Sequence, residues 1–409
     1  MESKLTDFFE GINDINLSNI IKDNNIKIYK KDDDIYDIIN SILENNFSEE
    51  SFFIVDIGKI IRQYLRWKEY LPDVELFYAM KCNPNPLIIE ILSGLGCSFD
   101  TASKGEIKTV LSMIDDPTRI IFANPCKMSN QIRYARAVDV DLTTFDSDHE
   151  LYKIKLYHPN CDLVLRIKVN DAKSICKFSC KFGASIPEAE KLLEIANTLN
   201  LKVVGVSFHI GSGCLDPTQF DEAIKDSRKV FNIAKEKFDI DMNILDIGGG
   251  FMDETFENTA QVINNSLKEN FGDLDYVRFL GEPGRFIVSN SHTLVVNIIG
   301  KKETRTVDDE KHFTYTINNS IYSAFNCIMF DYAKPVILPF NERTEEKKYE
   351  SIIFGFSCDG LDVISKSIML PEMTIGEYLY IENIGAYTVA ASSEFNGFSK
   401  AQLINIMSC

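Results

Sequence analysis

The sequence is short of basic side chains, with 43 lysines and arginines against 61 aspartates and glutamates among 409 residues. The formal net charge of -18 argues against nucleic acid or another polyanion as a partner, and it would attract a small cationic substrate. Acidity that serves solubility alone would explain the same charge. With 45% hydrophobic and 25% charged residues, the chain has the composition of a globular protein, and its length predicts two domains.

Paired cysteines and long apolar runs are also missing. The ten cysteines form no CxxC pair, which predicts reduced thiols and no structural zinc or other metal site. No run of about 18 apolar residues occurs, so we expect no membrane-spanning helix. The segment Met1–Asp7 lacks a basic stretch followed by an apolar one, so we expect a cytoplasmic protein.

From residue 76 onward, apolar runs that predict β-strands alternate with segments of helical pattern. The runs are 76–80, 97–101, 120–123, 142–145, 163–167, 203–210, 244–247 and 277–280. Residues 104–114, 186–198 and 218–238 are examples of the predicted helices. Eight strands alternating with helices predict an α/β fold, a parallel sheet closed into a (β/α)8 TIM barrel. An open doubly wound sheet is the alternative architecture.

A second domain is predicted from the change of pattern after residue 286, where apolar runs follow one another with little helix between them. The predicted strands are 286–288, 294–299, 313–317, 352–356 and 378–381, and the charged segments 301–311 and 341–349 are predicted hairpin loops. Such a pattern is typical of a mainly antiparallel sheet. We therefore assign residues 50–285 to the barrel and residues 1–49 and 286–409 to a β-sheet domain.

Lys81 stands at the end of the first predicted barrel strand, just before the turn residues Asn83 to Pro86. Barrel enzymes keep their working residues at the carboxyl ends of the strands. A lysine held against apolar walls loses its proton readily and can form a Schiff base with a carbonyl. A lysine that merely leaves the core for solvent is the alternative interpretation.

Glycines, a serine and an arginine after the last three predicted strands suggest a phosphate site. The triplet Gly248-Gly249-Gly250 lets backbone N–H groups approach an anion, although a tight turn alone would also explain it. It has neither the GxGxxG nor the GxxxxGK spacing of nucleotide-binding loops. Ser212 and Arg285 would complete a site for a single phosphate where barrels commonly bind one.

His209 and Glu282 also follow predicted strands. A histidine there is often a hydrogen-bonded core residue, but its ring could instead cover a bound aromatic cofactor. Glu282 precedes a Pro-Gly turn, where a solvated carboxylate would be ordinary. Beside a phosphate site and an amine it could face the pyridine nitrogen of pyridoxal 5'-phosphate and keep that nitrogen protonated, which suits the ring to accept the electrons of a decarboxylation.

With these residues in hand, the chain resembles the eukaryotic ornithine decarboxylase family, pyridoxal-phosphate-dependent enzymes with an alanine racemase-like barrel. The segments that carry the resemblance are Tyr78 to Asn83, Phe99 to Ser103, Leu163 to Ile167, Ser207 to Cys214, Leu245 to Phe251, Glu282 to Phe286, Ser323 to Cys327, Cys358 to Asp362 and Gly385 to Gly397. The resemblance as a whole extends from residue 52 to residue 398, nearly the whole chain.

The resemblance implies a role for each matching residue. Lys81 is similar to the lysine that bonds the cofactor aldehyde, His209 to the histidine stacked on its ring, and Glu282 to the acid on its nitrogen. The implied phosphate ligands are Ser212, Gly249, Gly250, Arg285 and Tyr387, and the implied supporting polar residues are Asp100, Glu106 and Arg166. Cys358 is similar to the cysteine that returns a proton to Cα, Asp331 and Asp359 to the pair that binds the distal ammonium, and Tyr322 is assigned to substrate binding with them.

The same resemblance implies a function and an assembly. It implies decarboxylation of L-ornithine to putrescine and carbon dioxide, the first step of polyamine biosynthesis, in a head-to-tail homodimer whose Cys358 loop serves the neighbouring subunit. Lysine is a conceivable minor substrate. Diaminopimelate decarboxylases typically carry Cys-Glu-Ser where this chain has Cys358-Asp359-Gly360, and alanine racemases place an arginine where it has Glu282.

A binding protein of the antizyme-inhibitor type, without cofactor chemistry, is the alternative function, although the chemical positions above are intact. Residues 128–155 align with the segment that binds antizyme in relatives, so an antizyme-like regulator is a further expectation. Departures from the family pattern fall at Asn318-Asn319-Ser320, where an Asp-Gly turn is usual, at Phe356-Ser357 in place of Pro-Thr, and at Val363 in place of a basic residue.

Overall fold

The computed structural model describes residues 15–45, 49–170, 174–176, 178–305, 308–340 and 346–409. The chain divides into two compact units, Gln63–Ile287 and Met1–Arg62 with Val288–Cys409. Among the described residues, no helix has the length and apolarity that a transmembrane span requires.

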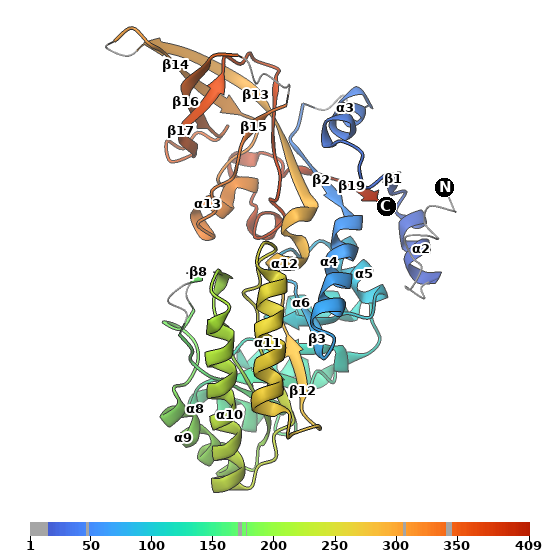
Figure 1. The fold of residues 1–409 in the computed structure, drawn as a ribbon, viewed down its shortest axis with the longest axis vertical. Helices are drawn as coiled ribbons and strands as arrows, with labels where there is room; N and C mark the ends of the chain where they lie inside the picture. The colour runs from blue at the N-terminus through green and yellow to red at the C-terminus, as the bar shows by residue number, and fades with distance from the viewer. Residues whose placement is uncertain (1–14, 46–48, 171–173, 177, 306–307, 341–345) are drawn as a thin grey trace. The chain divides into compact units, whose positions relative to one another are not determined.

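The unit Gln63–Ile287 is a closed barrel of parallel strands, in the order β11-β12-β3-β4-β5-β6-β7-β9 (Figure 1). The strands are β3 (Val74–Ala79), β4 (Ser98–Thr101), β5 (Ile120–Phe122), β6 (Leu142–Phe145), β7 (Asp162–Arg166), β9 (Lys202–Ser207), β11 (Ile244–Asp246) and β12 (Arg278–Gly281). Each of the predicted runs overlaps one of them. The predicted barrel is therefore confirmed, and the open sheet is wrong.

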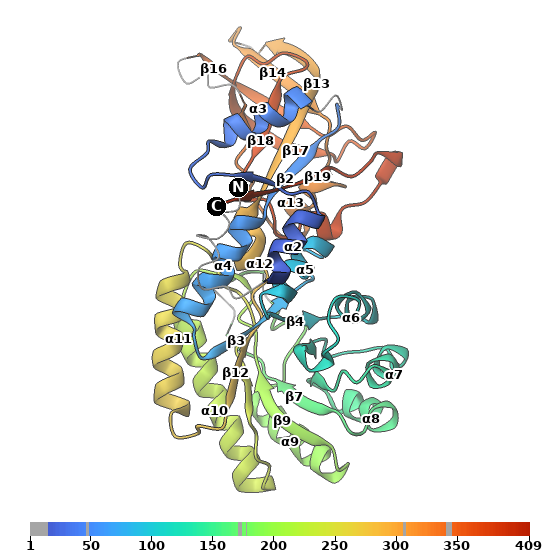
Figure 2. The ribbon, with the colours of Figure 1, turned by 90° about the vertical axis from the view of Figure 1, so that its right-hand side faces the viewer.

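Helices cover the outside of the barrel, as the alternating pattern predicts; Figure 2 shows α6, α7 and α8 outside β4 and β7. They are α4 (Ile57–Tyr70), α5 (Pro86–Gly94), α6 (Lys104–Leu111), α7 (Ser129–Ala137), α8 (Asp148–Tyr157), α9 (Ile186–Thr198), α10 (Thr218–Phe238) and α11 (Phe256–Phe271). Helix α9 begins with a capping box between Ser185 and Glu188. Helix α10 ends at Asp239, whose φ of 51° breaks the helical geometry.

The barrel interior is filled by side chains from its own strands. Phe77, Ile121, Val164, Val204, Ile244 and Leu280, each on a different strand, form one buried cluster. Trp67 of α4 is fully buried against the outer side, where a Cβ at Gly281 would lie 2.7 Å from its ring. Its indole N–H donates a hydrogen bond of 2.9 Å to the Val74 carbonyl, so strands β3 and β12 both meet this one side chain.

The second unit is built on a sheet of mainly antiparallel pairs, in the order β1-β19-β2-β13-β14-β16-β17, with β18 pairing with β13 and β15. The strands are β1 (Lys27–Tyr29), β2 (Phe52–Asp56), β13 (His292–Arg305), β14 (Lys311–Ile317), β15 (Leu338–Pro339), β16 (Lys348–Phe354), β17 (Val363–Pro371), β18 (Tyr378–Ile381) and β19 (Gln402–Ser408). The described helices that precede β2 are α2 (Ile15–Asp23) and α3 (Ile35–Asn45), and Ile38 and Ile39 of α3 pack on the sheet with Phe52 and Val295.

Three details differ from the prediction. Residues 286–288 form part of a short helix, α12 (Arg285–Val288), and three apolar residues in a row fit one helical turn as well as a strand. The charged segment 301–311 is only partly a loop, because β13 extends to Arg305 and β14 begins at Lys311, while 341–345 lies outside the described residues. The boundary moves from residue 50 to Arg62, because β2 pairs with β13 and β19.

A buried ion pair ties together the β5–β6 side of the barrel. The Lys127 amine lies 3.0 Å from the Glu150 carboxylate, and both side chains are 1% exposed. Lys127 also donates to the Thr144 carbonyl at 2.6 Å, and Lys153 contacts the other Glu150 oxygen at 2.5 Å. Burial lowers the pKa of Lys127, and the Glu150 carboxylate opposes that shift.

Removal of the buried acid should therefore destabilise the barrel strongly. We expect Glu150→Ala to lower the free energy of unfolding by about 3 to 5 kcal/mol, since it leaves a buried cation without its counter-ion. Glu190→Ala is the matched control, because Glu190 pairs with Lys237 at an exposed site and its loss should cost about 1 kcal/mol or less. Urea denaturation of both variants measures the difference, and equal midpoints would contradict the assignment.

Candidate active site

Lys81 follows strand β3 and reaches the next strand of the barrel. Its amine donates a hydrogen bond of 2.5 Å to Oδ2 of Asp100, which lies near the end of strand β4 and has a side chain that is 1% exposed. The Cys82 N–H bonds the Ala79 carbonyl, which turns the chain sharply after the strand. Asn85 then caps helix α5 by accepting from the Leu87 N–H. The lysine is thus fixed by a strand end, a turn and a buried carboxylate.

A pocket at the same end of the barrel gathers charged side chains from several strands. Arg166, His209, Asp246 and Glu282 line it, together with Ala123, Thr144, Ser207 and Phe208. Burial raises the pKa of Glu282 well above its usual range, and the nearby Asp100 and Asp246 carboxylates raise it further. Burial likewise raises the pKa of Asp246 to about 7. The pocket therefore holds acids that keep protons more readily than exposed carboxyls do.

The two basic side chains of this pocket, Arg166 and His209, have lowered pKa values. Burial lowers the pKa of Arg166, while the Glu282 carboxylate works against that shift. Burial lowers the pKa of His209 well below its usual range, and the positive charges of Arg166 and Lys81 add to the effect. The His209 ring is consequently neutral at physiological pH, and it meets the Phe178 ring edge-on at 5.0 Å.

Several buried oxygens around the pocket have no hydrogen-bond partner among the described residues. They are Oδ1 of Asp100, Oγ1 of Thr144, Oγ of Ser207 and Oε1 of Glu282. Buried polar atoms are normally satisfied, so such a cluster indicates a polar ligand. A protonated ring nitrogen fits Oε1 of Glu282, because a buried carboxylate is the natural acceptor for such a donor.

Glycines beside the pocket leave room for an anion. Gly250 has a φ of 113°, and a Cβ there would lie 2.5 Å from the Gly211 carbonyl. A Cβ at Gly249 would lie 2.7 Å from the Glu282 carbonyl and 3.0 Å from Nε2 of His209. Arg285 donates a hydrogen bond of 3.1 Å to Oγ of Ser212. A phosphate group fits this set of backbone amides, hydroxyl and guanidinium.

Glu106 supports the Lys81–Asp100 pair from helix α6. Its carboxylate accepts a hydrogen bond from the Ala102 N–H, and its own N–H donates to Oγ of Ser103 at 3.3 Å. Burial raises the pKa of Glu106, the Asp100 carboxylate adds to that shift, and Lys81 opposes it. Its negative charge favours the protonated lysine.

The remaining predicted site residues belong to the β-sheet unit. The Tyr322 hydroxyl donates a hydrogen bond to Oδ2 of Asp359. A bond from the Leu361 N–H lowers the pKa of Asp359, and the Tyr322 bond adds to that shift. Cys358 is exposed, and its N–H donates to Oδ1 of Asn396 at 3.0 Å. Asp331 follows the short helix α13 (Cys327–Phe330) and is 7% exposed. Tyr387 is half-buried at a φ of 54°.

The structure thus groups the sequence-predicted residues into two sets. In the barrel it brings together Lys81, Asp100, Glu106, Arg166, His209, Ser212, Gly249, Gly250, Glu282 and Arg285. In the β-sheet unit, the hydrogen bond from Tyr322 to Asp359 links the Tyr322 segment to the Cys358–Asp359 segment. Asp331 and Tyr387 belong to the same unit. Asp246, Thr144 and Ser207 also line the pocket, and the sequence alone assigned no role to them. Asp246 could have been noticed, since it is an acid at a strand end, whereas the two hydroxyls carry no such signal.

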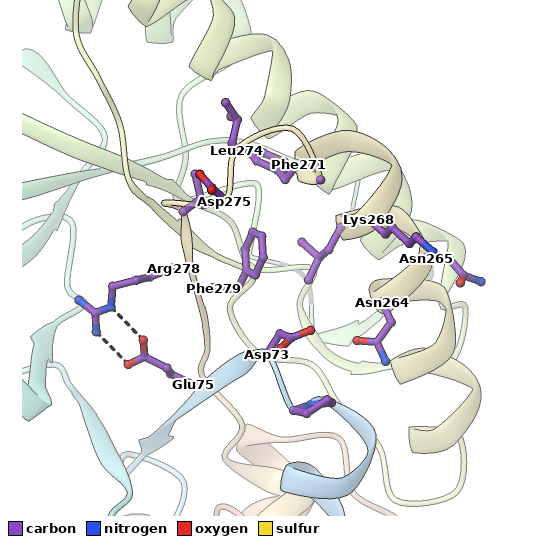
Figure 3. A pocket seen from close by; sticks show the side chains of 14 residues that line it. Asp73, Glu75, Asn264, Asn265, Lys268, Phe271, Leu274, Asp275, Arg278 and Phe279 are labelled. Carbon is purple, nitrogen blue, oxygen red and sulfur yellow. Dashed lines mark hydrogen bonds and ion pairs between the residues drawn. The ribbon is translucent and has the colours of Figure 1, made fainter.

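A larger pocket lies at the opposite end of the barrel, between helix α11 and the starts of β3 and β12 (Figure 3). Its most prominent feature is the ion pair in which Arg278 donates two hydrogen bonds of 2.8 Å to the Glu75 carboxylate. This pair joins the strands where the barrel closes, which is a structural role. None of the predicted site residues lines this pocket.

Known proteins resemble the chain over most of its length. Ornithine decarboxylase of Schizosaccharomyces pombe is 44% identical over 364 residues, which cover 87% of this chain and 83% of that protein. Antizyme inhibitor 2 of Xenopus laevis is 43% identical over 378 residues, which cover 89% and 82%. The crystal structure of the arginine decarboxylase of Paramecium bursaria Chlorella virus superposes with a TM-score of 0.86 at 34% identity, covering 91% of this chain and all of that one, 100%.

The barrel sequence also matches a family model. The model describes the pyridoxal binding domain of pyridoxal-dependent decarboxylases, and it matches residues 57–289. That range contains the barrel pocket, the glycines beside it and Lys81. The family model and the relatives show that this chain belongs to the pyridoxal-dependent decarboxylases.

Proposed function

We propose that the protein decarboxylates L-ornithine to putrescine and carbon dioxide. The observation that carries the proposal is the amine of Lys81 on Asp100, in a barrel whose pocket holds the unpartnered oxygen of Glu282. When bound, pyridoxal phosphate supplies an aldehyde that bonds an amine and a ring that takes up the electrons left by carbon dioxide. The residues described above would hold that cofactor by its phosphate, by its ring nitrogen and through Lys81.

The chain's own residues manage the protons of this reaction. Asp100 and Glu106 hold a proton on the Lys81 amine, and removal of that proton frees a nucleophile. Glu282 would accept a hydrogen bond from the ring nitrogen and keep it protonated. His209 would cover one face of the ring as a neutral side chain and so would not repel that positive charge.

The proposed substrate follows from charge and from the relatives. Asp359 is ionised and held by Tyr322, and Asp331 supplies a second carboxylate, a pair that suits a primary ammonium group. The relative from Schizosaccharomyces pombe is named ornithine decarboxylase and the solved viral structure arginine decarboxylase, so substrate choice within this family varies. One methylene discriminates by about 1 to 3 kcal/mol, so slow turnover of lysine is also expected.

We propose that Cys358 returns the proton to Cα, and that it does so in the barrel site of a second subunit. The apolar side chains of Phe330, Tyr332 and Leu361 support a head-to-tail homodimer, because they are 73%, 68% and 73% exposed beside the predicted substrate-binding residues. Exposed apolar groups of this size are typical of interfaces. The Tyr387 hydroxyl would add a phosphate ligand.

A regulatory protein of the antizyme type is a further proposed partner, with residues 128–155 as its binding segment. The relative named antizyme inhibitor 2 supports it, as do Met128 and Tyr152, which are 61% and 51% exposed at helices α7 and α8. We also propose a cytoplasmic location, supported by ten scattered cysteines without CxxC spacing.

A binding protein without catalysis is the second candidate function, because antizyme inhibitor 2 matches this chain nearly as well as the decarboxylase does. The two candidates differ in cofactor chemistry. Each residue type that the enzyme's chemistry would need in the barrel is present in the sequence, which favours the enzyme.

Product analysis separates these candidates. We expect protein supplied with pyridoxal phosphate to show a visible absorbance band and to release putrescine from ornithine faster than any product from lysine, arginine or diaminopimelate. Lys81→Ala should lose the band and the turnover, and Lys68→Ala, at a surface lysine of helix α4, should keep both. A wild-type protein with neither band nor product would support the binding role.

Mixing two inactive variants tests the shared site. Lys81→Ala and Cys358→Ala should each form little putrescine alone. Random exchange of subunits gives a heterodimer with one intact site, so putrescine formation should recover to about a quarter of the wild-type rate. No recovery after verified exchange would place Lys81 and Cys358 of one subunit in the same site.

The raised pKa of Asp246 predicts how the free energy of unfolding depends on pH in the protein without its cofactor. Its folded pKa of about 7 lies above the unfolded value, so the folded state keeps a proton that the unfolded state releases. Stability is therefore greatest below the unfolded pKa and falls as pH rises to about 7. Asp246→Asn should flatten this decline by up to about 1.4 kcal/mol per pH unit, and exposed Glu222→Gln should not. Urea denaturation from pH 4 to 8 measures it, and parallel curves would contradict it.

A further inference from the structure

Asp362 is a buried carboxylate that none of the roles above explains. It is 1% exposed and accepts hydrogen bonds from Oγ of Ser320 at 2.8 Å, from the Ile321 N–H at 3.0 Å and from the Ser357 N–H at 3.0 Å. Within the described part of the chain no lysine or arginine pairs with it. Three uncharged donors from two loops therefore balance its charge, so the carboxylate holds those loops together.

The loop that carries Cys358 and Asp359 closes around this carboxylate. The Asp362 N–H donates to the Asp359 carbonyl at 3.1 Å, and the Gly355 N–H donates to the Asp362 carbonyl at 2.9 Å. A Cβ at Gly355 would lie 2.3 Å from both carboxylate oxygens, so only glycine allows this approach. The ends of the loop are thus fixed on either side of Cys358.

Ser320 connects the carboxylate to the segment that carries Tyr322. Its hydroxyl donates to Asp362 and accepts from the Tyr322 N–H at 3.0 Å, and its side chain is buried. The Tyr322 hydroxyl donates to Asp359 in turn, and the Phe356 N–H donates to the Asn319 carbonyl at 3.2 Å. The bonds Ser320–Asp362, Tyr322–Asp359 and Phe356–Asn319 join segment 319–322 to segment 355–362.

We propose that Asp362 and Ser320 are positioning residues, which hold Cys358 and Asp359 in the geometry that the reaction needs. The inference rests on the proposed function, in which Cys358 delivers a proton to Cα and Asp359 binds the distal ammonium. Both would act through the loop that carries Cys358 and Asp359. If this hold on Cys358 were lost, Cys358 would deliver its proton to Cα less often, and the cofactor carbon would take up a proton instead. Hydrolysis in that case releases 4-aminobutanal, and the nitrogen stays on the cofactor.

Three variants test whether Asp362 and Ser320 position the loop that carries Cys358. They are Ser320→Ala, Asp362→Asn and a matched control. The control is Ser323→Ala, since Ser323 is a buried serine of the same segment whose hydroxyl has no hydrogen-bond partner among the described residues. Two quantities are measured on the full chain with pyridoxal phosphate. They are the ratio of 4-aminobutanal to putrescine, and amide hydrogen exchange in peptides that cover 318–324 and 353–363.

We expect Ser320→Ala to raise the aldehyde ratio and to speed exchange in both peptides by about tenfold, the effect of one lost hydrogen bond to a charged group. Barrel peptides and the control should match the wild type. Asp362→Asn should do more, and the double variant should do less than the sum, because the two residues share one bond. Should Asp362→Asn fail to fold, Ser320→Ala decides alone.

The outcomes separate this inference from the function on which it rests. A wild-type protein that does not decarboxylate ornithine contradicts the proposed function, and exchange still tests the hold on the loop. An active wild type with Ser320→Ala equal to Ser323→Ala in both measurements overturns the inference. Faster exchange with an unchanged product ratio overturns it too, since the loop would then be ordered by Asp362 without effect on the proton transfer.

Discussion

Burial of charge at one end of a closed barrel is the constraint on which this site depends. Asp100, Asp246 and Glu282 lie almost out of contact with water, and Arg166 and Lys81 are the cations near them. A carboxylate in such a place is stable only if it keeps a proton or has a cation beside it. An apolar filling would pack with less cost, so the arrangement is explained by chemistry and not by stability.

The barrel could be predicted because its strands are short apolar runs with helical segments between them, and the helices 186–198 and 218–238 have the predicted bounds. The failures are local. Three apolar residues at 286–288 fit a strand and a helical turn equally well, and the structure has a turn of helix there. Strand β13 continues into charged residues up to Arg305, because its far end lies on the surface where polar side chains suit a strand.

The site shows the same difference between local and distant information. Lys81, Asp100 and Glu282 could be predicted, since each stands at a strand end and parallel strands bring such ends together. The part that Asp246 plays in the site depends on the neighbouring strand β12, because Glu282 directly follows the end of that strand. The hydrogen bond between Ser320 and Asp362 joins residues 42 positions apart, and no hydrophobic periodicity or sequence motif predicts it. Ser320, which lies in the departure at Asn318-Asn319-Ser320, supplies one side of that bond.

Trp67 is the one tryptophan of the sequence, and it is fully buried in the barrel unit against Gly281, Phe251 and Phe256. Its intrinsic fluorescence consequently reports on the barrel alone, at the seam where the first and last strands meet. The tyrosines, in contrast, are spread over both units. Emission excited at the red edge of the indole band follows the opening of one unit while circular dichroism follows both, so the two folding events can be observed separately in unlabelled protein.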